Sequence, residues 1–126
     1  MTRERVSTHR AGARGEDTAA AYLVAQGWTV LHRNYRTRYA EIDIIAGHDD
    51  VLAFIEVKAW GGLSRSELGA AVDRRKQARI AGAARSFLAR RPELSDRHMR
   101  FDVVFIDGRG GGIEHFANAW SGEGID

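Results

Sequence analysis

The sequence predicts an α/β domain in which a mixed β-sheet carries helices on its faces. Three observations predict this class. Apolar runs rich in β-branched and aromatic residues, typical of strands, alternate with two helix-favouring segments. The second helix-favouring segment lies between the third and fourth strands, and such a crossover makes those two strands parallel. The length of 126 residues suffices for one hydrophobic core and is short for two.

The elements follow one another without long gaps. A helix is expected at about 12–26, because this stretch is rich in alanine and is followed by Gly27, a residue favoured just past a helix C-terminus. The expected strands cover about 28–34, 40–46, 51–58, 101–107 and 113–119, with turns at 47–50 and 108–112 and a flexible loop at 61–66. We expect residues 11–120 to form one domain, 1–10 a flexible N-terminal segment and 121–126 a C-terminal tail.

The second helix is expected from Glu67 to Arg91, where Pro92 stops it. One stripe of this helix is apolar, and the opposite arc carries arginines, with Lys76 near the boundary. The stripe consists of Ile80, Ala84, Phe87 and Leu88, and the arc of Arg74, Arg75, Arg79, Arg85 and Arg90. The arginines form either an ordinary solvated face or, because all carry one sign of charge, a ridge that contacts phosphates.

Composition narrows the class of protein. There is no cysteine, which excludes disulfides and thiolate chemistry, and no apolar run approaches the ~20 residues of a membrane span. No apolar segment of a secretory signal follows the N-terminus, so we expect a cytoplasmic protein. The net charge is +2, and Lys58 and Lys76 are the only lysines among 19 basic residues. The arginine bias suits phosphate contacts, but a GC-rich genome would produce it as well.

Carboxylates stand on two neighbouring strands that are otherwise apolar. Alternation places Glu41 and Asp43 on one face of their strand and Glu56 and Lys58 on one face of the next. If the two strands pair around the 47–50 turn, these side chains converge. An isolated charge on a buried strand costs several kcal/mol, so the cluster is either a structural ion-pair network or a site.

A divalent cation held for phosphodiester chemistry is the interpretation that gives each group a task. Asp43 and Glu56 would supply hard oxygen ligands, together with the Val57 carbonyl, to Mg²⁺ or Mn²⁺. Lys58 would orient the attacking water or stabilise the anionic transition state. Repulsion between Asp43 and Glu56 would raise the pKa of one of them.

The acidic residue Asp43 followed by Glu56-Val57-Lys58 resembles the PD-(D/E)XK signature of restriction-endonuclease-like nucleases. A closer resemblance, to the bacterial YraN-like family, covers nearly the whole chain. Its motifs are Gly15-Glu16, Ala19-Ala20, Tyr22-Leu23, Gly27, Asn34, Glu41-Ile42-Asp43, Phe54-Ile55-Glu56-Val57-Lys58, Lys76 with Ile80 and Ala84, and Arg100-Phe101-Asp102-Val103-Val104.

That resemblance implies a restriction-endonuclease-like αβββαβ(β) core, similar to Holliday-junction resolvases. It also implies Glu16 as a fourth acidic residue of the site, although a helix dipole explains a glutamate in a first helical turn equally well. Two positions depart from the family pattern: Ala40 stands where glycine is usual, and Trp60 where arginine is usual. Trp60 would either stack on an unpaired base or pack internally.

The leading hypothesis is a Mg²⁺- or Mn²⁺-dependent nuclease acting on DNA, branched or partly single-stranded. Its catalytic group would comprise Lys58, Asp43, Glu56, Glu16 and Glu41, and its nucleic-acid contacts Arg74, Arg75, Lys76, Arg79, Arg85 and Trp60. Two alternatives stay open: a nucleic-acid-binding module without turnover, and a protein-interaction domain. By analogy with nucleases of this fold, which often act as symmetric pairs, we also expect that the protein can form a homodimer. Asp102 is expected to point to the same sheet face as the cluster.

Overall fold

The computed structural model describes residues 15–60, 72–107 and 112–120. A helix at 15–25 precedes five strands and a second long helix. The elements are β1 (Thr29–Arg36), β2 (Glu41–His48), β3 (Val51–Trp60), α3 (Arg74–Arg90), a 3-10 turn (Pro92–Leu94), β4 (His98–Asp107) and β5 (Ile113–Trp120). The expectations for 1–10, the 61–66 loop, most of the 108–112 turn and the tail at 121–126 lie outside the described residues.

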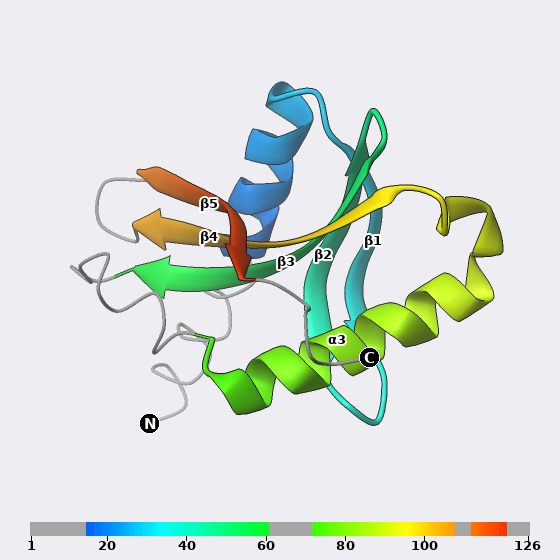
Figure 1. The fold of residues 1–126 in the computed structure, drawn as a ribbon. Helices are drawn as coiled ribbons and strands as arrows, with labels where there is room; N and C mark the ends of the chain where they lie inside the picture. Colours follow the sequence, from blue (N-terminus) through cyan, green and yellow to red (C-terminus); the bar gives the residue numbers. More distant parts are fainter. Residues whose placement is uncertain (1–14, 61–71, 108–111, 121–126) are drawn as a thin grey trace.

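The sheet is mixed and follows the order β1-β2-β3-β4-β5 (Figure 1). β3 and β4 are parallel, in a register that runs from Val51↔His98 to Trp60↔Asp107, and α3 lies between them in the sequence. All other neighbouring strands are antiparallel. This confirms the predicted class, a restriction-endonuclease-like core of order αβββαββ.

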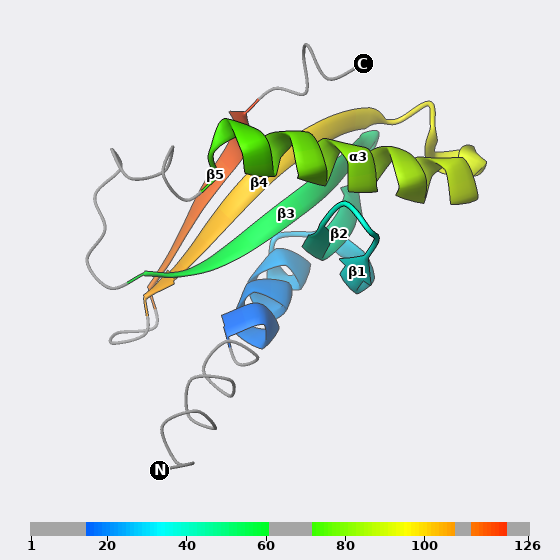
Figure 2. The ribbon, with the colours of Figure 1, turned by 90° about the horizontal axis from the view of Figure 1, so that it is seen from below.

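The two helices cover opposite faces of the sheet (Figure 2). Successive side chains of a strand point to opposite faces of the sheet, so the strands pack against both helices. The α3 side includes Ile80, Ala84 and Phe87 of the predicted stripe, packed on Leu52, Phe54, Phe101, Val103 and Phe105. The other side includes Ala19 and Leu23 of the N-terminal helix, packed on Ile44, Ala46, Ala53, Ile55, Val104 and Ile106.

The start of α3 differs from the prediction. Asp73 has extended backbone, and its carboxylate accepts a hydrogen bond from the Lys76 backbone N–H at 2.9 Å. The helix therefore begins at Arg74, and the predicted continuation through Val72 and Asp73 is wrong, because an aspartate in this role terminates a helix on its N-terminal side. The part of the expectation at 67–71 lies outside the described residues.

The strands are longer than predicted. His48 belongs to β2 and pairs with Val51, so the turn at this hairpin consists of Asp49 and Asp50 alone. Asp49 has a φ of 53°, the left-handed conformation that two-residue hairpin turns require and aspartate tolerates.

Within the described residues, no helix combines the length and the apolar character that crossing a membrane would require.

Candidate active site

The site begins where β2 and β3 stop pairing. Their antiparallel ladder runs from His48↔Val51 to Ile44↔Ile55. Beyond the last pair, the Val57 backbone N–H donates to Asp43 Oδ2 at 2.8 Å. The Asp43 side chain thus accepts a hydrogen bond from the backbone of β3, in place of the backbone of β2. The separation of the two strands leaves room for carboxylates at this edge of the sheet.

The side-chain alternation of β2 breaks at the same point. Ile42 packs on the α3 side and Ile44 on the opposite side, although they are two residues apart. Strict alternation therefore fails between Ile42 and Ile44, so it does not by itself put Glu41 and Asp43 on one face. Both side chains nevertheless line one hollow of about 450 Å³, whose walls are Tyr39, Ala40, Glu41, Asp43, Glu56, Asp73, Lys76 and Arg79.

Among the described residues, the cation nearest to Glu56 comes from α3. Lys76 Nζ donates to Glu56 Oε1 at 2.8 Å, whereas Lys58 Nζ lies 4.0 Å from the same oxygen. Lys76 belongs to the first turn of α3, which places its side chain over the sheet rather than in the arginine arc. Sequence reasoning assigned Lys76 to nucleic-acid contacts and missed this pairing, because the two residues are 20 positions apart on different elements.

The charges of the cluster shift its pKa values. Burial and the negative charge of Glu56 raise the pKa of Asp43 to about 7, although the Val57 N–H partly opposes the shift. Burial also raises the pKa of Glu16, against the opposing charge of Arg33. Burial alone would lower the pKa of Lys76, but the hydrogen bond and charge of Glu56 outweigh it and the pKa lies above its ordinary value.

Asn34 joins the N-terminal helix to the cluster. With its amide nitrogen turned toward the carboxylates, it donates to Glu16 Oε1 at 2.7 Å and to Glu41 Oε1 at 2.9 Å. Its φ is 54°, a left-handed conformation that asparagine tolerates better than most residues. Through this amide, Glu16 is connected to Glu41 of the cluster. Only the family resemblance implied that Glu16 belongs to the site.

A divalent cation fits this donor set without a complete protein cage. No group of three or more His, Cys, Asp and Glu side chains within the described residues is arranged to hold a metal by itself. Mg²⁺ does not need one, because it keeps several waters and takes one or two carboxylates plus substrate phosphates. Asp43 Oδ2 accepts from Val57, which leaves Oδ1 as the oxygen that Mg²⁺ would use, on a residue that lines the hollow.

The predicted arginines of α3 are all exposed, but only three of the five line one of the two hollows. Arg79 lines the carboxylate hollow, and Arg79, Arg85 and Arg90 line a second, larger hollow, which we call the arginine groove. Arg74 and Arg75 line neither of these two. Trp60 ends β3, and its side chain lies outside the described part of the chain.

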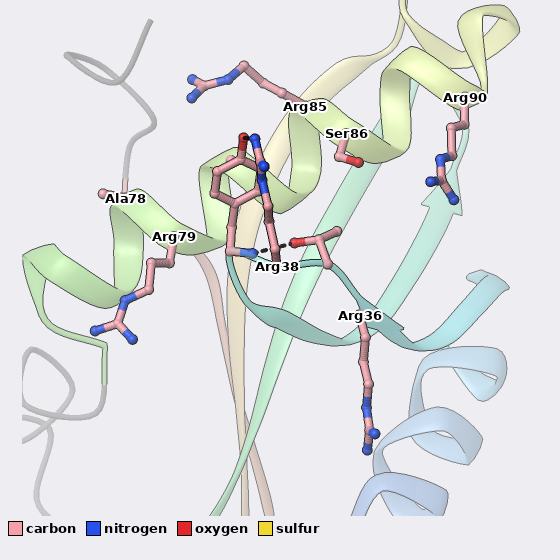
Figure 3. A pocket seen from close by; sticks show the side chains of 10 residues that line it. Arg36, Arg38, Ala78, Arg79, Arg85, Ser86 and Arg90 are labelled. Carbon is pink, nitrogen blue, oxygen red and sulfur yellow. Dashed lines mark hydrogen bonds between the residues drawn. The ribbon is translucent and has the colours of Figure 1, made fainter.

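The arginine groove runs between α3 and the β1–β2 connection and encloses about 860 Å³ (Figure 3). Arg36 and Arg38 come from the end of β1 and the connection, and were not predicted as contacts. The basic-aromatic run Arg36-Thr37-Arg38-Tyr39 between two strands was the available sequence signal. The full lining is Arg36, Thr37, Arg38, Tyr39, Ala78, Arg79, Gly82, Arg85, Ser86 and Arg90.

Asp102 lies on the other face of the sheet, so the expectation that it joins the cluster face is wrong. Its buried carboxylate accepts two hydrogen bonds from Arg100 and one from the Asn118 backbone N–H, and pairs with His115 Nε2 at 2.8 Å. His115 in turn contacts the Tyr22 hydroxyl of the N-terminal helix. Burial alone would raise the pKa of Asp102, but these bonds outweigh it and lower the pKa.

Comparison with known proteins places the chain in a family. Residues 15–106 match the model described as "Uncharacterised protein family UPF0102". A UPF0102 protein of Azorhizobium caulinodans is 42% identical over 122 residues, which cover 97% of this chain and 91% of the relative. A second, from Desulforapulum autotrophicum, is 50% identical over 77% of this chain and 79% of its own length.

A third relative, from Syntrophotalea carbinolica, is 42% identical over 98% of this chain and 99% of its own length. Likeness therefore extends over the N-terminal helix, the sheet and α3, and includes the segments that carry Glu16, Asp43, Glu56 and Lys76. The chain belongs to the UPF0102 family, the YraN-like family that its motifs resemble.

Proposed function

We propose that this protein is a Mg²⁺- or Mn²⁺-dependent nuclease that hydrolyses DNA phosphodiester bonds. The observation that carries the proposal is the position of Asp43 and Glu56. They line one hollow where β2 and β3 separate, with Lys76 on Glu56 and an arginine groove alongside. A purely structural ion pair would not need two converging carboxylates, one of which has its pKa raised to about 7.

Asp43, Glu56 and the Val57 carbonyl would hold the cation in this proposal. When bound, the cation promotes ionisation of a water and neutralises charge on the attacked phosphate. Lys58 shares a face of β3 with Glu56 and would orient the water and stabilise the charge that develops on phosphate oxygens. A water oxygen would bond to phosphorus after losing one proton to solvent, and the bond from phosphorus to the departing sugar oxygen would break. The departing oxygen takes up a proton, so the products are a terminal phosphate and a hydroxyl.

The remaining acids would have supporting tasks. Glu16 and Glu41 share the Asn34 amide, which fixes their carboxylates beside the hollow. Their negative charge raises the pKa of Asp43 in the protein without cation, and a bound cation would reverse that effect. Arg79 stands at the rim, where it would hold a neighbouring phosphate.

A nucleic-acid-binding module without turnover is the second candidate, and one observation favours it. The ammonium of Lys76 already lies 2.8 Å from Glu56 Oε1, so the charge of Glu56 is balanced without a metal. The exposed arginines of α3 would still attract a polyanion in such a module. A homodimer stays part of both proposals by fold analogy, and sedimentation analysis of the full chain tests it.

The deciding experiment compares the full-length protein with Asp43→Asn and Glu56→Gln on labelled duplex, single-stranded, flap and branched DNA, with Mg²⁺ or Mn²⁺. We expect cleavage by the parent and a loss of at least about a hundredfold in each variant, because each removes a ligand of the cation. Asp50→Asn is the matched control, since it removes a carboxylate from the exposed turn at the far end of the same hairpin.

Thermal melting supplies a second readout of the same site. A ligand that binds only the folded state raises the melting temperature, so Mg²⁺ or Mn²⁺ should stabilise the parent and not Glu56→Gln. Unchanged cleavage in both variants would refute the nuclease. Retained, salt-sensitive DNA binding with no cleavage of any substrate by the parent would favour the binding module.

A further inference from the structure

We propose that the arginine groove receives a single-stranded segment of the nucleic acid, with one base stacked on Tyr39 at the border of the carboxylate hollow. The inference rests on the proposed function for the identity of the polymer, and adds which part of the substrate lies where. Three features favour this occupant: the aromatic ring at the border, the positive charge of the walls and the continuity of the two hollows.

Tyr39 is held in place while much of it stays exposed. The residue is 46% exposed, one of the most exposed large apolar side chains of the described chain. Its backbone N–H donates to Thr37 Oγ1 at 3.0 Å. Its ring rests on α3 at Gly82, where an added Cβ would lie 3.3 Å from the ring carbon Cγ. A fixed, exposed aromatic surface lowers the ordering cost of stacking a base.

Arg38 adds a cation to this surface. Its guanidinium carbon lies 5.2 Å from the centre of the Tyr39 ring, and its Nη2 donates to the Tyr39 hydroxyl at 3.2 Å. Unpaired bases stack on aromatic rings and on guanidinium planes, while their phosphates pair with the same cations. Because the Arg38 guanidinium lies over the Tyr39 ring, a base would stack there as the guanidinium moves from the ring to a phosphate.

The walls of the groove are positive on both sides. Arg79, Arg85 and Arg90 come from α3 and Arg38 from the opposite wall, whereas the Arg36 side chain points away from α3 and its Nε lies 3.6 Å from Glu41 Oε1 (Figure 3). The lining of this groove includes no acidic residue. A chain of phosphates is the complementary occupant, because arginine forks match phosphate oxygens and two walls track one backbone.

A single strand fits this groove better than a duplex. Bases within a duplex are stacked on one another, so their faces are closed to a tyrosine, whereas an unpaired base offers its face. The arginine groove and the carboxylate hollow share Tyr39 and Arg79. A strand in the groove therefore continues directly to the phosphate that Asp43 and Glu56 would address.

Binding is measured by fluorescence anisotropy in EDTA with a labelled single-stranded oligothymidylate and with a duplex of equal length. Tyr39→Leu keeps an apolar contact at Gly82 but loses the aromatic face, and we expect single-strand affinity to fall at least about fivefold. Duplex affinity should change less than about twofold. Tyr39→Phe should retain single-strand binding, because it keeps the ring.

The arginines supply an independent measure. Arg38→Ala and Arg85→Ala should each reduce the slope of log affinity against log salt by about 0.7, the value for one phosphate contact on a single strand. Arg97→Ala is the matched control, since it removes the same charge outside both hollows. Melting curves establish that each variant is folded before its affinity is interpreted.

The outcomes separate this inference from the nuclease proposal. Loss of single-strand affinity in Tyr39→Leu supports the groove even if no metal produces cleavage. A Tyr39→Leu variant that binds both polymers as the parent does, or loses both equally, overturns the groove even if cleavage depends on Glu56. A parent that does not bind the single strand also overturns it.

Discussion

The Asp43 carboxyl has a different environment in the folded chain from the one it has in the unfolded chain. Its pKa rises from 3.8 to about 7, first because the carboxyl is buried and then because Glu56 is negative. A carboxylic acid with a raised pKa binds its proton more tightly in the folded state. Its contribution therefore favours the fold at low pH and is lost as the pH rises from about 4 to about 7.

Asp43→Asn should consequently be more stable than the parent at pH 8 in the absence of divalent cations. The asparagine oxygen still accepts from Val57, while the buried charge is gone. The gain has an upper bound of roughly 4 kcal/mol and should shrink as the pH falls toward 4. Urea denaturation at pH 8, 6 and 4.5 measures it, with Asp50→Asn as the control. A pH-independent difference would contradict the assignment.

Lys76 Nζ lies closer to Glu56 Oε1 than Lys58 Nζ does, so loss of Lys76 should lower the free energy of unfolding more than loss of Lys58. Lys76→Met leaves the nearly buried Glu56 without its 2.8 Å partner and should cost ~1–3 kcal/mol, reduced from the fully buried case because Lys76 is partly exposed. Lys58→Met removes a charge 4.0 Å away and should cost less than ~1 kcal/mol.

Chemical denaturation of both lysine variants at pH 7 measures these costs. The penalty for Lys76→Met should largely disappear in the Glu56→Gln background, because the carboxylate that it leaves behind is gone. Equal penalties for Lys58→Met and Lys76→Met would refute the assignment of Lys76 as the main partner.

At the scale of the elements, the first turn of α3 controls the site. Asp73 caps the helix, and the cap fixes where its first turn lies over the sheet. That placement brings Lys76 to Glu56 and leaves Arg79 at the rim of the hollow. The separation of β2 from β3 after Ile44↔Ile55 provides the other half of the site.

A substitution at Gly82 of α3 tests whether the Tyr39 ring is held against this helix. Glycine inside a helix is about 1 kcal/mol less favourable than alanine, so Gly82→Ala should stabilise α3 wherever space allows. The added Cβ would press on Tyr39 at 3.3 Å, so we expect little or no gain in the parent. In the Tyr39→Ala background, the same change should stabilise the protein by about 1 kcal/mol.

A double-mutant cycle in thermal or urea denaturation isolates this coupling between Gly82 and Tyr39. The coupling should be close to 1 kcal/mol if the ring rests on Gly82. Full stabilisation by Gly82→Ala in the parent would show that the Tyr39 ring moves away freely, and would weaken the case for a preorganised stacking surface.

For the molecule as a whole, the sheet separates two polar regions. On the α3 side, the carboxylate hollow and the arginine groove share a border at Tyr39 and Arg79. On the other side, the buried Asp102 network links β4 and β5 to the N-terminal helix through His115 and Tyr22. Its carboxylate is satisfied by protein donors, which fits a structural role for that face.

The sequence by itself determined the class, the element order and the apolar stripe of α3, because strand alternation and helical periodicity are local patterns. It also placed Asp43 and Glu56 on adjacent strands of a hairpin, since a short turn leaves little choice of partner. Helix and strand ends were less accurate: the capping role of Asp73 and the two-residue turn at Asp49 depend on which side-chain and backbone conformations prevail.

Only the tertiary structure decided which cations and amides meet these carboxylates. Lys76 reaches Glu56 because the crossover lays α3 over β3, and Asn34 reaches Glu16 through a positive φ that no periodicity encodes. The arginine groove likewise combines Arg38 and Arg79, which are 41 positions apart in the sequence. Contacts between distant segments depend on packing of the whole sheet, which is the physical reason that local patterns left them open.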